Sequence, residues 1–359
     1  MSRVLHWICD APSPYNAYLF RTLAAVPGFS LQVHYRRLGV SSHPWTQSLL
    51  DGYASREIEA GPLLDRVLTR AALDRDGAVL LIGGWYDLTL QALITFARAP
   101  FAIWTDTPDL TATRSAAKEA LRAAWLRRVL PRAARVFGTG VPALDVLAHM
   151  GAPRSRLENL PYSIDLDAYR PATTRTPGQP LTVVSSGRLA AQKGYDYALR
   201  ALASAFGGTD IAIRYRIAGT GPDEAELRAL ASSLGIADAV EWLGWTEPTA
   251  LPAFYRSADV FLHPARWEPY GVVILEAMAS GLPVLASRRT NAALDRIVDG
   301  QNGRLHDAGD IEMLARHLRW CHDAPDALRD AGMAAYRTAH EWPIARAVGM
   351  ITRFMASVE

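Results

Sequence analysis

The sequence has few cysteines, no long apolar run and almost no net charge, and each of these shortages excludes a class of protein. Only two of the 359 residues are cysteine, Cys9 and Cys321, and without metal-ligand spacing they are typical of a reducing compartment. The first apolar run is too short for a signal peptide, and no run reaches the about 18 residues that a spanning helix needs. A net charge of +2 does not indicate a nucleic-acid partner. We therefore expect a cytoplasmic globular protein.

What the sequence does contain is an alternation of short apolar runs with helical segments, which is typical of an α/β protein with parallel sheets. The predicted strands are residues 4–8, 31–35, 79–82, 101–104, 135–137, 181–184, 215–218, 240–244, 260–262 and 284–286. Between the two halves the composition changes to Thr, Pro, Gly and Gln, which predicts a linker at 172–180. The chain is long enough for two cored domains, 1–171 and 181–341, followed by an amphipathic helix at 342–355.

Two carboxylates eight residues apart, Glu268 and Glu276, lie around a predicted helix start between the last two predicted strands. We place Pro269 in the first helical turn and Gly281 at the left-handed position after the helix. Glu268 then lies in the strand-to-helix loop, where ligands bind in doubly wound sheets. The N–H groups of the next residues would point there and suit an anion, namely those of Tyr270, Gly271 and Val272.

Glu276 lies in a helix that is apolar on nearly all sides, and burying an unpaired carboxylate costs several kcal/mol. Side chains lean toward the helix N-terminus, so Glu276 can reach the same loop and accept a hydrogen bond from a ligand hydroxyl. The alternatives are a carboxylate that only complements the helix dipole, or one that pairs with an arginine.

A second loop, after the strand 181–184, carries two cations between glycines. The guanidinium group of Arg188 is planar and can donate two parallel hydrogen bonds, while the ammonium group of Lys193 is a compact point charge. Their separation of five residues suits the binding of a phosphate. The glycines Gly187 and Gly194 do not have the spacing of a Walker motif or of a dinucleotide-binding fingerprint. The loop is weak evidence by itself.

The strongest charge asymmetry lies between Arg114 and Arg135, where seven basic residues and one acidic residue give +6, against −4 for the remainder. This segment is predicted to be a helix from about 115 to 130, with Leu121, Trp125 and Val129 along one stripe. A basic amphipathic helix suits an anionic membrane surface, and a solvated helix face is the alternative explanation.

Together these blocks resemble the retaining, nucleotide-sugar-dependent glycosyltransferases of the GT-B fold, in particular family 4, also called glycosyl transferases group 1. The similarity spans nearly the whole chain and is strongest in the second half. Five blocks occur in the family's order and spacing: Ser186-Gly-Arg-Leu189 with Lys193-Gly194, Gly219-Thr-Gly-Pro222, Trp242-Leu-Gly244, Glu268-Pro-Tyr-Gly271 and Glu276-Ala-Met-Ala-Ser-Gly-Leu-Pro-Val284.

The resemblance implies two Rossmann-like domains facing a cleft, with the final helix, 342–359, crossing back to the first domain. It implies that Arg188 and Lys193 hold the diphosphate of a nucleoside diphosphate sugar, of UDP or GDP type, and that Glu276 binds the ribose hydroxyls. Glu268 would act as a catalytic residue on the transferred sugar, with the backbone of Tyr270 and Gly271. The remaining donor-binding positions are Gly187, Val272 and Trp245.

The first half departs from the family pattern. Many relatives carry a Gly-rich loop after the first strand, where this chain has Ser13-Pro-Tyr-Asn16, and Asn16 becomes the acceptor-side candidate. Many also carry a His after the strand that ends here at Trp104, where this chain offers Asp106. Asp106 is then either a catalytic residue that orients the acceptor or stabilises positive charge at the sugar, or a helix N-cap.

We therefore predict an enzyme that transfers a sugar to a hydroxyl acceptor with retained configuration, in bacterial polysaccharide, lipopolysaccharide or glycolipid synthesis. No metal is expected, because two cations and a helix terminus supply the charge that the leaving diphosphate needs. The alternatives are a sugar-nucleotide epimerase of the same fold and a catalytically silent sugar-nucleotide-binding subunit.

Overall fold

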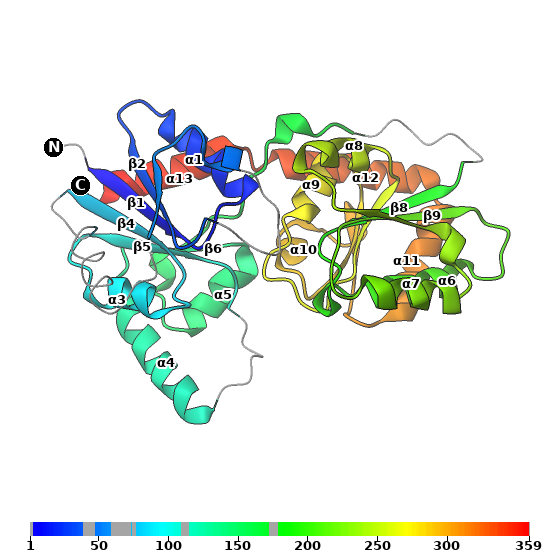
Figure 1. Ribbon diagram of the computed structural model, residues 1–359, viewed down its shortest axis with the longest axis horizontal. Coiled ribbons are helices and arrows are strands. Elements are labelled where there is room, and N and C mark those ends of the chain that lie inside the picture. Colours follow the sequence, from blue (N-terminus) through cyan, green and yellow to red (C-terminus); the bar gives the residue numbers. More distant parts are fainter. Residues whose placement is uncertain are drawn as a thin grey trace. The chain divides into compact units, whose positions relative to one another are not determined.

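The computed structural model describes residues 3–38, 47–58, 73, 77–108, 115–171 and 179–358. Most of the predicted linker, residues 172–178, lies outside this part of the chain. The chain forms two compact units, one of residues 1–164 with 344–359 and the other of residues 165–343. Figure 1 shows a twisted sheet with helices on both faces in each unit.

The first unit is built on a parallel sheet of seven strands in the order β3-β2-β1-β4-β5-β6-β7. The strands are β1 (Val4–Cys9), β2 (Ser30–Tyr35), β3 (Ser55–Glu57), β4 (Ala78–Gly83), β5 (Phe101–Thr105), β6 (Arg135–Gly138) and β7 (Leu157–Asn159). The helices are α1 (Pro14–Ala24), α3 (Leu88–Phe96), α4 (Ala116–Val129), α5 (Val141–His149) and α13 (Ile344–Ser357). The sequence predicted five of these strands but not the short edge strands β3 and β7.

The C-terminal helix α13 belongs to the first unit, as the resemblance implied. Its buried face includes Met350, Ile351 and Phe354, which join one core with Trp7 and Phe20. α13 packs beside α1 on one face of the sheet (Figure 1). The opposite face of the sheet has a separate core, to which α3, α4 and α5 contribute.

The second unit has a parallel sheet of six strands in the order β10-β9-β8-β11-β12-β13. The strands are β8 (Leu181–Ser186), β9 (Ile213–Ala218), β10 (Val240–Gly244), β11 (Val260–His263), β12 (Val284–Ser287) and β13 (Gly303–His306). The helices are α6 (Tyr195–Phe206), α7 (Glu224–Ser233), α8 (Leu251–Arg256), α9 (Val273–Ala279), α10 (Asn291–Arg296), α11 (Ile311–Asp323) and α12 (Pro325–His340). Two Rossmann-like units with parallel sheets confirm the predicted fold class, while the predicted cleft stays a prediction.

The helix α9 ends as its sequence predicts and begins later than predicted. Gly281 follows it with φ of 72°, and the N–H groups of Gly281 and Leu282 donate to the carbonyls of Met278 and Ala277, which is a Schellman motif. The first helical residue is Val273, so the placement of Pro269 in the first turn was wrong. Pro269 lies in the loop, where its carbonyl accepts a hydrogen bond from the Asn291 side chain at 2.6 Å.

Candidate functional site

The strand order of the second sheet brings the two predicted binding loops together. The chain runs outward from β8 through β9 to β10, and then continues on the other side of β8 with β11, β12 and β13. The order therefore reverses between β8 and β11, and ligands bind at the carboxyl ends of the two strands at such a switch point. The loop after β8 carries Arg188 and Lys193, and the loop after β11 carries Glu268.

Glycines make the loop after β8 possible. Gly187 has φ of 139°, and a side-chain carbon at Gly219 would overlap with the Gly187 carbonyl. The two glycine-bearing loops thus pack backbone against backbone, with the N–H of Leu189 donating to the Thr220 carbonyl at 2.9 Å. The side chain of Arg188 is left exposed and, among the described residues, makes no hydrogen bond or ion pair.

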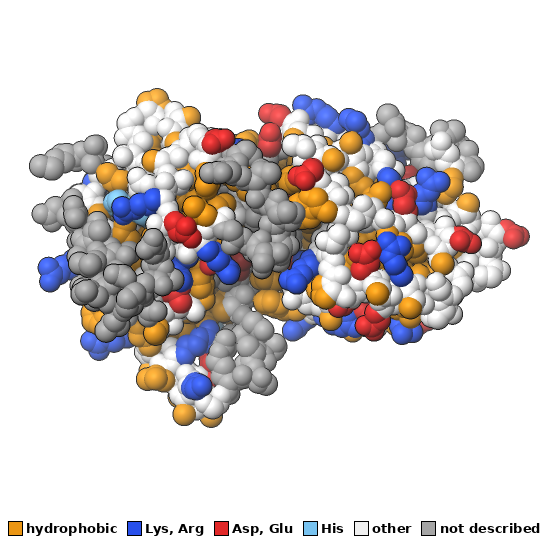
Figure 2. Space-filling model, viewed as in Figure 1, with side chains coloured by type: hydrophobic (Ala, Val, Ile, Leu, Met, Phe, Trp, Pro, Cys, Tyr) orange, Lys and Arg blue, Asp and Glu red, His pale blue; other side chains and the backbone are white. Residues whose placement is uncertain are grey.

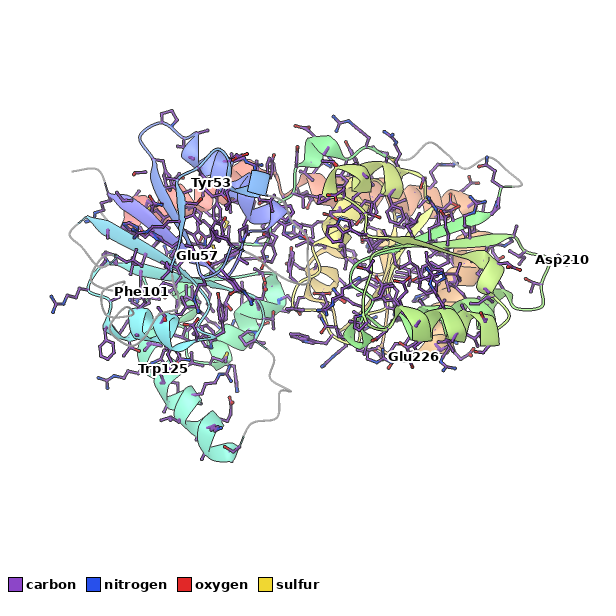
Figure 3. All side chains as sticks on the ribbon, in the orientation of Figure 1. Tyr53, Glu57, Phe101, Trp125, Asp210 and Glu226 are labelled. Carbon is purple, nitrogen blue, oxygen red and sulfur yellow. The ribbon has the colours of Figure 1, made fainter. Side chains whose placement is uncertain are left out.

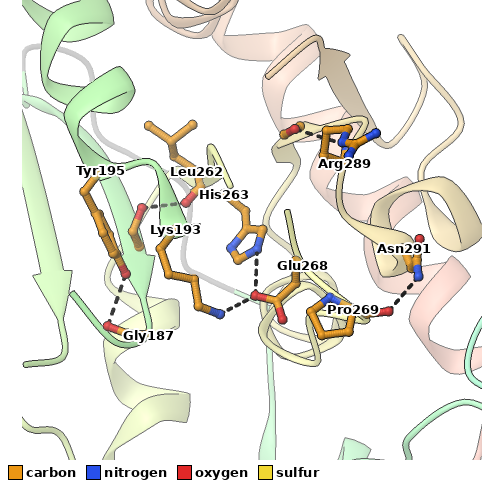
Figure 4. A network of polar contacts seen from close by, with 11 residues as sticks. Gly187, Lys193, Tyr195, Leu262, His263, Glu268, Pro269, Arg289 and Asn291 are labelled. Atoms are coloured by element: carbon orange, nitrogen blue, oxygen red, sulfur yellow. Dashed lines mark hydrogen bonds and ion pairs between the residues drawn. The ribbon is translucent and has the colours of Figure 1, made fainter. Parts of the chain in front are cut away.

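Gly194 brings Lys193 against the loop after β11. It has φ of 68°, and a side-chain carbon there would overlap with the carbonyl oxygen of Pro264. The ammonium group of Lys193 donates to the Glu268 carboxylate, which Figure 4 shows as a direct contact. The predicted phosphate cation and the predicted sugar-binding carboxylate therefore form an ion pair with each other.

Glu268 is a buried and ionised carboxylate. Its side chain is 10% exposed, and the Nε2 atom of His263 lies 3.6 Å from the oxygen that Lys193 contacts (Figure 4). Burial raises the pKa of Glu268, but His263 and Lys193 outweigh burial and lower this pKa to about 2. Burial is also the main cause of the lowered pKa of His263. Sequence reasoning missed His263, although its position directly before the loop, as the last residue of β11, was a usable signal.

The loop from Glu268 to Val272 is fixed by the segment that follows β12. Glu268 donates its N–H to the Arg289 carbonyl at 3.0 Å, and the N–H of Ala292 donates to the Tyr270 carbonyl at 2.8 Å. Gly271 has φ of 96°, and a side-chain carbon there would lie 2.9 Å from Thr290. Among the described residues, no hydrogen bond takes up the N–H groups of Gly271 and Val272, two of the three groups predicted to face an anion.

Glu276 is buried on α9, and its partners are tyrosines. The hydroxyl of Tyr255 on α8 donates to Glu276 at 2.7 Å, and the Ser186 hydroxyl lies 2.7 Å from that of Tyr255. Burial raises the pKa of Glu276, while hydrogen bonds from Tyr255 and Tyr169 oppose the rise. An arginine partner, one of the alternatives, is not found among the described residues. Sequence reasoning missed Tyr255, which precedes Glu276 by 21 positions.

The remaining predicted donor residue, Trp245, lies after the edge strand β10, away from the switch point. Its ring N–H donates to Glu247 at 2.9 Å. Tyr270, in contrast, is 2% exposed and lies in the fixed loop.

The sheet of the first unit has its own switch point, between β1 and β4. Asn16 lies beside it in the first turn of α1, which Ser13 caps by accepting the N–H of Asn16 at 3.3 Å. The Asn16 side chain is buried at 8% exposure, and its Oδ1 atom accepts no hydrogen bond among the described residues. An acceptor without a partner in a buried place suits a ligand N–H or O–H donor.

Asp106, directly after β5, accepts two hydroxyl donors. They are Thr139 Oγ1 at 2.7 Å and the Tyr162 hydroxyl at 3.1 Å. The ring of Tyr162 also packs 5.9 Å from that of Tyr15, which connects Asp106 to the loop that carries Asn16. α4 is capped by Ser115, so Asp106 is not the cap of that helix. Thr139 and Tyr162 were missed, because sequence reasoning had no means of pairing them with Asp106.

The chain contains two Asp-x-Asp sequences, Asp74-Arg-Asp76 and Asp165-Leu-Asp167, of the kind that can hold a metal ion. Asp74 and Asp76 lie outside the described residues, and Asp165 accepts the N–H of Asp167 at 3.1 Å in a turn. Within the described ranges, no group of three or more His, Cys, Asp or Glu could hold a metal ion. The same ranges contain no helix with the length and apolar character needed to cross a membrane.

Comparison with known proteins gives a family match in the second unit. Residues 170–338 match the family model described as "Glycosyl transferases group 1". The putative colanic acid biosynthesis glycosyltransferase WcaL of Escherichia coli (strain K12) is 31% identical over 179 residues, covering 48% of this chain and 43% of WcaL. A GDP-mannose-dependent phosphatidylinositol monomannoside mannosyltransferase of Mycobacterium tuberculosis (strain CDC 1551 / Oshkosh) is 32% identical over 212 residues, covering 54% and 53%.

A relative matched over most of its length is the D-inositol 3-phosphate glycosyltransferase of Nocardia farcinica (strain IFM 10152), 28% identical over 96% of this chain and 84% of the relative. For several other curated relatives, including WcaL, this chain spans only about half the length.

Solved structures match the fold over the whole chain. Anabaena Alr3699/HepE in complex with UDP superposes with a TM-score of 0.80 at 17% identity, covering 99% of this chain and 100% of that one. The lipopolysaccharide outer core galactosyltransferase WaaB superposes with a TM-score of 0.76 at 16% identity, covering 98% and 99%.

Proposed function

We propose, from the premise that residues 170–338 belong to the glycosyl transferases group 1 family, that this protein transfers a sugar from a nucleoside diphosphate sugar to a hydroxyl acceptor with retention. The observation that carries the proposal is the set of complementary groups at the switch point of the second sheet. Lys193 contacts the buried, ionised carboxylate of Glu268 there, and Arg188 lies exposed on the same loop as Lys193. A sugar diphosphate needs cations for its phosphates and an acceptor for its hydroxyls.

Arg188 and Lys193 stabilise the leaving group in this mechanism. The bond between the sugar carbon and the diphosphate oxygen breaks with its electron pair going to the oxygen, so negative charge grows on the diphosphate. Cations beside that charge lower the barrier, because they stabilise the charge as it develops. The N–H groups of Gly271 and Val272 at the start of α9 add to the same effect. This supply of charge supports activity without a metal ion.

Glu268 and Glu276 bind hydroxyl groups of the donor. Glu268 accepts hydrogen bonds from hydroxyls of the transferred sugar, and Glu276 accepts them from the ribose. In the first unit, Asp106 and Asn16 are the acceptor-side groups, with Asp106 oriented by Thr139 and Tyr162. An ionised Asp106 is suited to receive the proton that the acceptor hydroxyl loses.

The relatives support the donor type and the broad pathway. The name of the mycobacterial relative specifies GDP-mannose, and the structure of HepE holds UDP. WcaL is assigned to colanic acid synthesis and WaaB to the lipopolysaccharide outer core. We therefore place this protein in the synthesis of a polysaccharide, lipopolysaccharide or glycolipid, with a UDP or GDP sugar as donor.

A binding screen followed by a turnover assay tests the proposal. UDP or GDP should raise the melting temperature more than ADP or dTDP, because a ligand that binds only the folded state stabilises it.

Glu276→Gln should lower donor affinity, and Arg188→Ala should mostly lower turnover, since the phosphate contact strengthens as charge develops. Binding without transfer or hydrolysis of any donor would indicate the silent subunit, and interconversion of sugar nucleotides would indicate the epimerase.

EDTA tests the proposed absence of a metal requirement. Activity should persist in excess EDTA, because Arg188, Lys193 and the N-terminus of α9 supply the charge. Loss of activity in EDTA and its recovery with manganese or magnesium would contradict this assignment.

We also propose that α4 brings the first unit to an anionic membrane surface. The predicted apolar stripe is divided in the structure: Val129 is buried, while Leu121 is 74% exposed and projects with the first half of the helix. Trp125, labelled in Figure 3, donates to Thr95 at 2.9 Å and marks where α4 joins the rest of the unit. Figure 2 shows hydrophobic and basic side chains beside one another on the projecting part. An apolar residue among cations suits an interface with anionic lipid.

Only some of the predicted basic residues are available for this contact. Arg122 pairs with Glu119, Arg132 donates to carbonyls at the C-terminal end of α3, and Arg135 pairs with Glu158. Arg114 lies outside the described residues. Among the described residues, the exposed cations of α4 without a partner are Lys118, Arg127 and Arg128.

A further inference from the structure

In the ligand-free second unit, Lys193 and Glu268 are each other's main partner. Their side chains are 18% and 10% exposed, so both charges are largely withdrawn from water. Among the described residues, the side chain of Lys193 makes no other hydrogen bond or ion pair, and the Nε2 atom of His263 lies 3.6 Å from the Glu268 carboxylate. A buried charge that loses its partner is strongly destabilised. Any ligand that attracts one member of this pair therefore affects the other.

We propose that the Lys193–Glu268 pair discriminates against the free nucleoside diphosphate in favour of the intact sugar nucleotide, an inference that rests on the proposed function. The intact donor gives each of the two residues a new partner, because its phosphates bind Lys193 while hydroxyls of its sugar donate to Glu268. The free nucleoside diphosphate attracts Lys193 but offers Glu268 no donor.

Charge repulsion acts in the same direction. Removing the sugar converts a terminal phosphate ester into a phosphate with a second ionisable oxygen, so the product carries more negative charge than the donor. That extra charge lies where the sugar was attached, and therefore next to the carboxylate of Glu268. Like charges placed together in a partly buried site repel each other strongly.

His263 keeps Glu268 in position while Lys193 is occupied by phosphate. Its ring lies on β11, is 3% exposed and stacks on Phe261 at 6.2 Å, so it is a fixed neighbour of the carboxylate. It is a positioning residue, since it reaches the donor only through Glu268. After transfer, the Glu268 carboxylate has lost its hydroxyl donor, and this favours release of the nucleoside diphosphate. A new donor molecule restores the contacts to both Lys193 and Glu268.

Calorimetric titration of the full chain with UDP, GDP, UDP-glucose and GDP-mannose tests the inference. Glu268→Gln keeps the shape of the side chain and removes its charge, so the affinity for the preferred nucleoside diphosphate should rise by about tenfold, the effect of one charge-assisted hydrogen bond. The affinity for the intact sugar nucleotide should fall or stay unchanged in the same variant. Lys193→Met should weaken the binding of both ligands.

A matched control and a second variant keep the result interpretable. Glu158→Gln removes one member of another half-buried ion pair, that with Arg135 in the first unit, and should leave all four affinities unchanged. Glu268→Ser is a smaller neutral replacement and should also bind the nucleoside diphosphate more tightly if Glu268→Gln does not fold, as judged by circular dichroism.

The outcomes separate the two proposals. If the wild-type protein binds nucleoside diphosphates and transfers sugar, but neither neutral variant binds the nucleoside diphosphate more tightly, the discrimination by the ion pair is refuted and the proposed function stands. If the wild-type protein binds none of the four ligands, the proposed function fails and the inference fails with it.

Discussion

Tyr255 connects the end of β8 with the buried carboxylate of Glu276, and this one hydroxyl group has two partners. It donates to Glu276, so the Ser186 hydroxyl 2.7 Å away must donate to it. Tyr255→Phe should destabilise the protein by about 1–2 kcal/mol in urea unfolding. It should also weaken donor binding, because the pKa of Glu276 rises further when the Tyr255 hydrogen bond is lost, and a protonated carboxyl is a poorer acceptor.

Tyr215→Phe is the matched control for this change. Tyr215 is equally buried, and its hydroxyl lies 2.9 Å from the Ser185 hydroxyl, with no carboxylate involved. It should reproduce the loss of stability and leave donor affinity intact. Equal effects of both variants on donor affinity would show that Tyr255 has no specific influence on Glu276.

The ionised state of Glu268 makes the protein sensitive to acid. Its pKa is about 2 in the folded protein against an ordinary value of 4.5, so its contribution to stability is fully present above about pH 4.5 and is lost as the pH falls toward 2. The wild-type protein should therefore lose on the order of 3 kcal/mol more than Glu268→Gln between these pH values. Urea unfolding at a series of pH values measures the difference, and parallel curves would contradict the assigned pKa.

Single site residues could be found in the sequence, but their partners could not. Lys193 and Glu268 follow from loop position, while their contact depends on Gly194 packing against Pro264, 70 residues later in the chain. Such a contact depends on which strands are neighbours, and local patterns do not fix that order. Asp106 was recognised in the same way, and its donors Thr139 and Tyr162 come from other strands' loops.

At the scale of elements, the end of α9 offers a sharp test. A side-chain carbon at Gly281 would lie 3.0 Å from Pro171 in addition to adopting a left-handed conformation. Gly281→Ala should lower the free energy of unfolding by about 2 kcal/mol or more in urea titration. Gly235 ends α7 with the same hydrogen bonds and φ of 70°, but nothing lies within 4 Å. Gly235→Ala should therefore cost only about 1 kcal/mol, and equal losses would mean that Pro171 yields to the added methyl group.

The projecting half of α4 should bind anionic vesicles. Each available cation contributes about 1 kcal/mol, so Lys118→Glu, Arg127→Glu and Arg128→Glu together should lower the partition coefficient at least a hundredfold. Co-sedimentation with vesicles containing phosphatidylserine measures it, and the binding should fade as salt shortens the Debye length below about 8 Å.

A charge-matched variant in the second unit is the control for α4. Arg200, Arg214 and Arg256 are exposed arginines there, and changing them to Glu should leave vesicle binding intact. No binding of the wild-type protein at low salt would refute the membrane contact and favour a soluble acceptor.

The long strands were predicted from the sequence better than the helices, and better than the short strands at the sheet edges. Every long predicted strand is present because a strand covered on both faces has a continuous apolar run. The short strands β3, β7 and β13 lie at sheet edges, where less burial leaves a weaker pattern. α11 and α12 were also missed, although each has the periodic apolar face of an amphipathic helix. α4 shows a different kind of discrepancy. Its apolar residues recur at helical spacing, but only part of the stripe that they form is buried.

At the scale of the whole molecule, α13 should stabilise the first unit only. Ile351 is 0% exposed in that unit's core, and Ile351→Ala should cost about 3 kcal/mol. Hydrogen exchange should then lose protection in residues 3–164 and keep it in residues 179–343. Ile274→Ala on α9, at the same 0% exposure, should give the reverse pattern. Loss of protection throughout the chain in both variants would mean that the units unfold together.

The placement of α13 also has a consequence for synthesis on the ribosome. The first unit contains both the earliest residues and residues 344–359, so its last helix is translated only after the whole of residues 165–343. During that interval the surface that Met350, Ile351 and Phe354 later cover faces water with its apolar side chains. The usual order, in which the N-terminal domain folds first, is thus inverted. The second unit can complete its core first, and the apolar surface of the first unit stays uncovered until α13 has been synthesised.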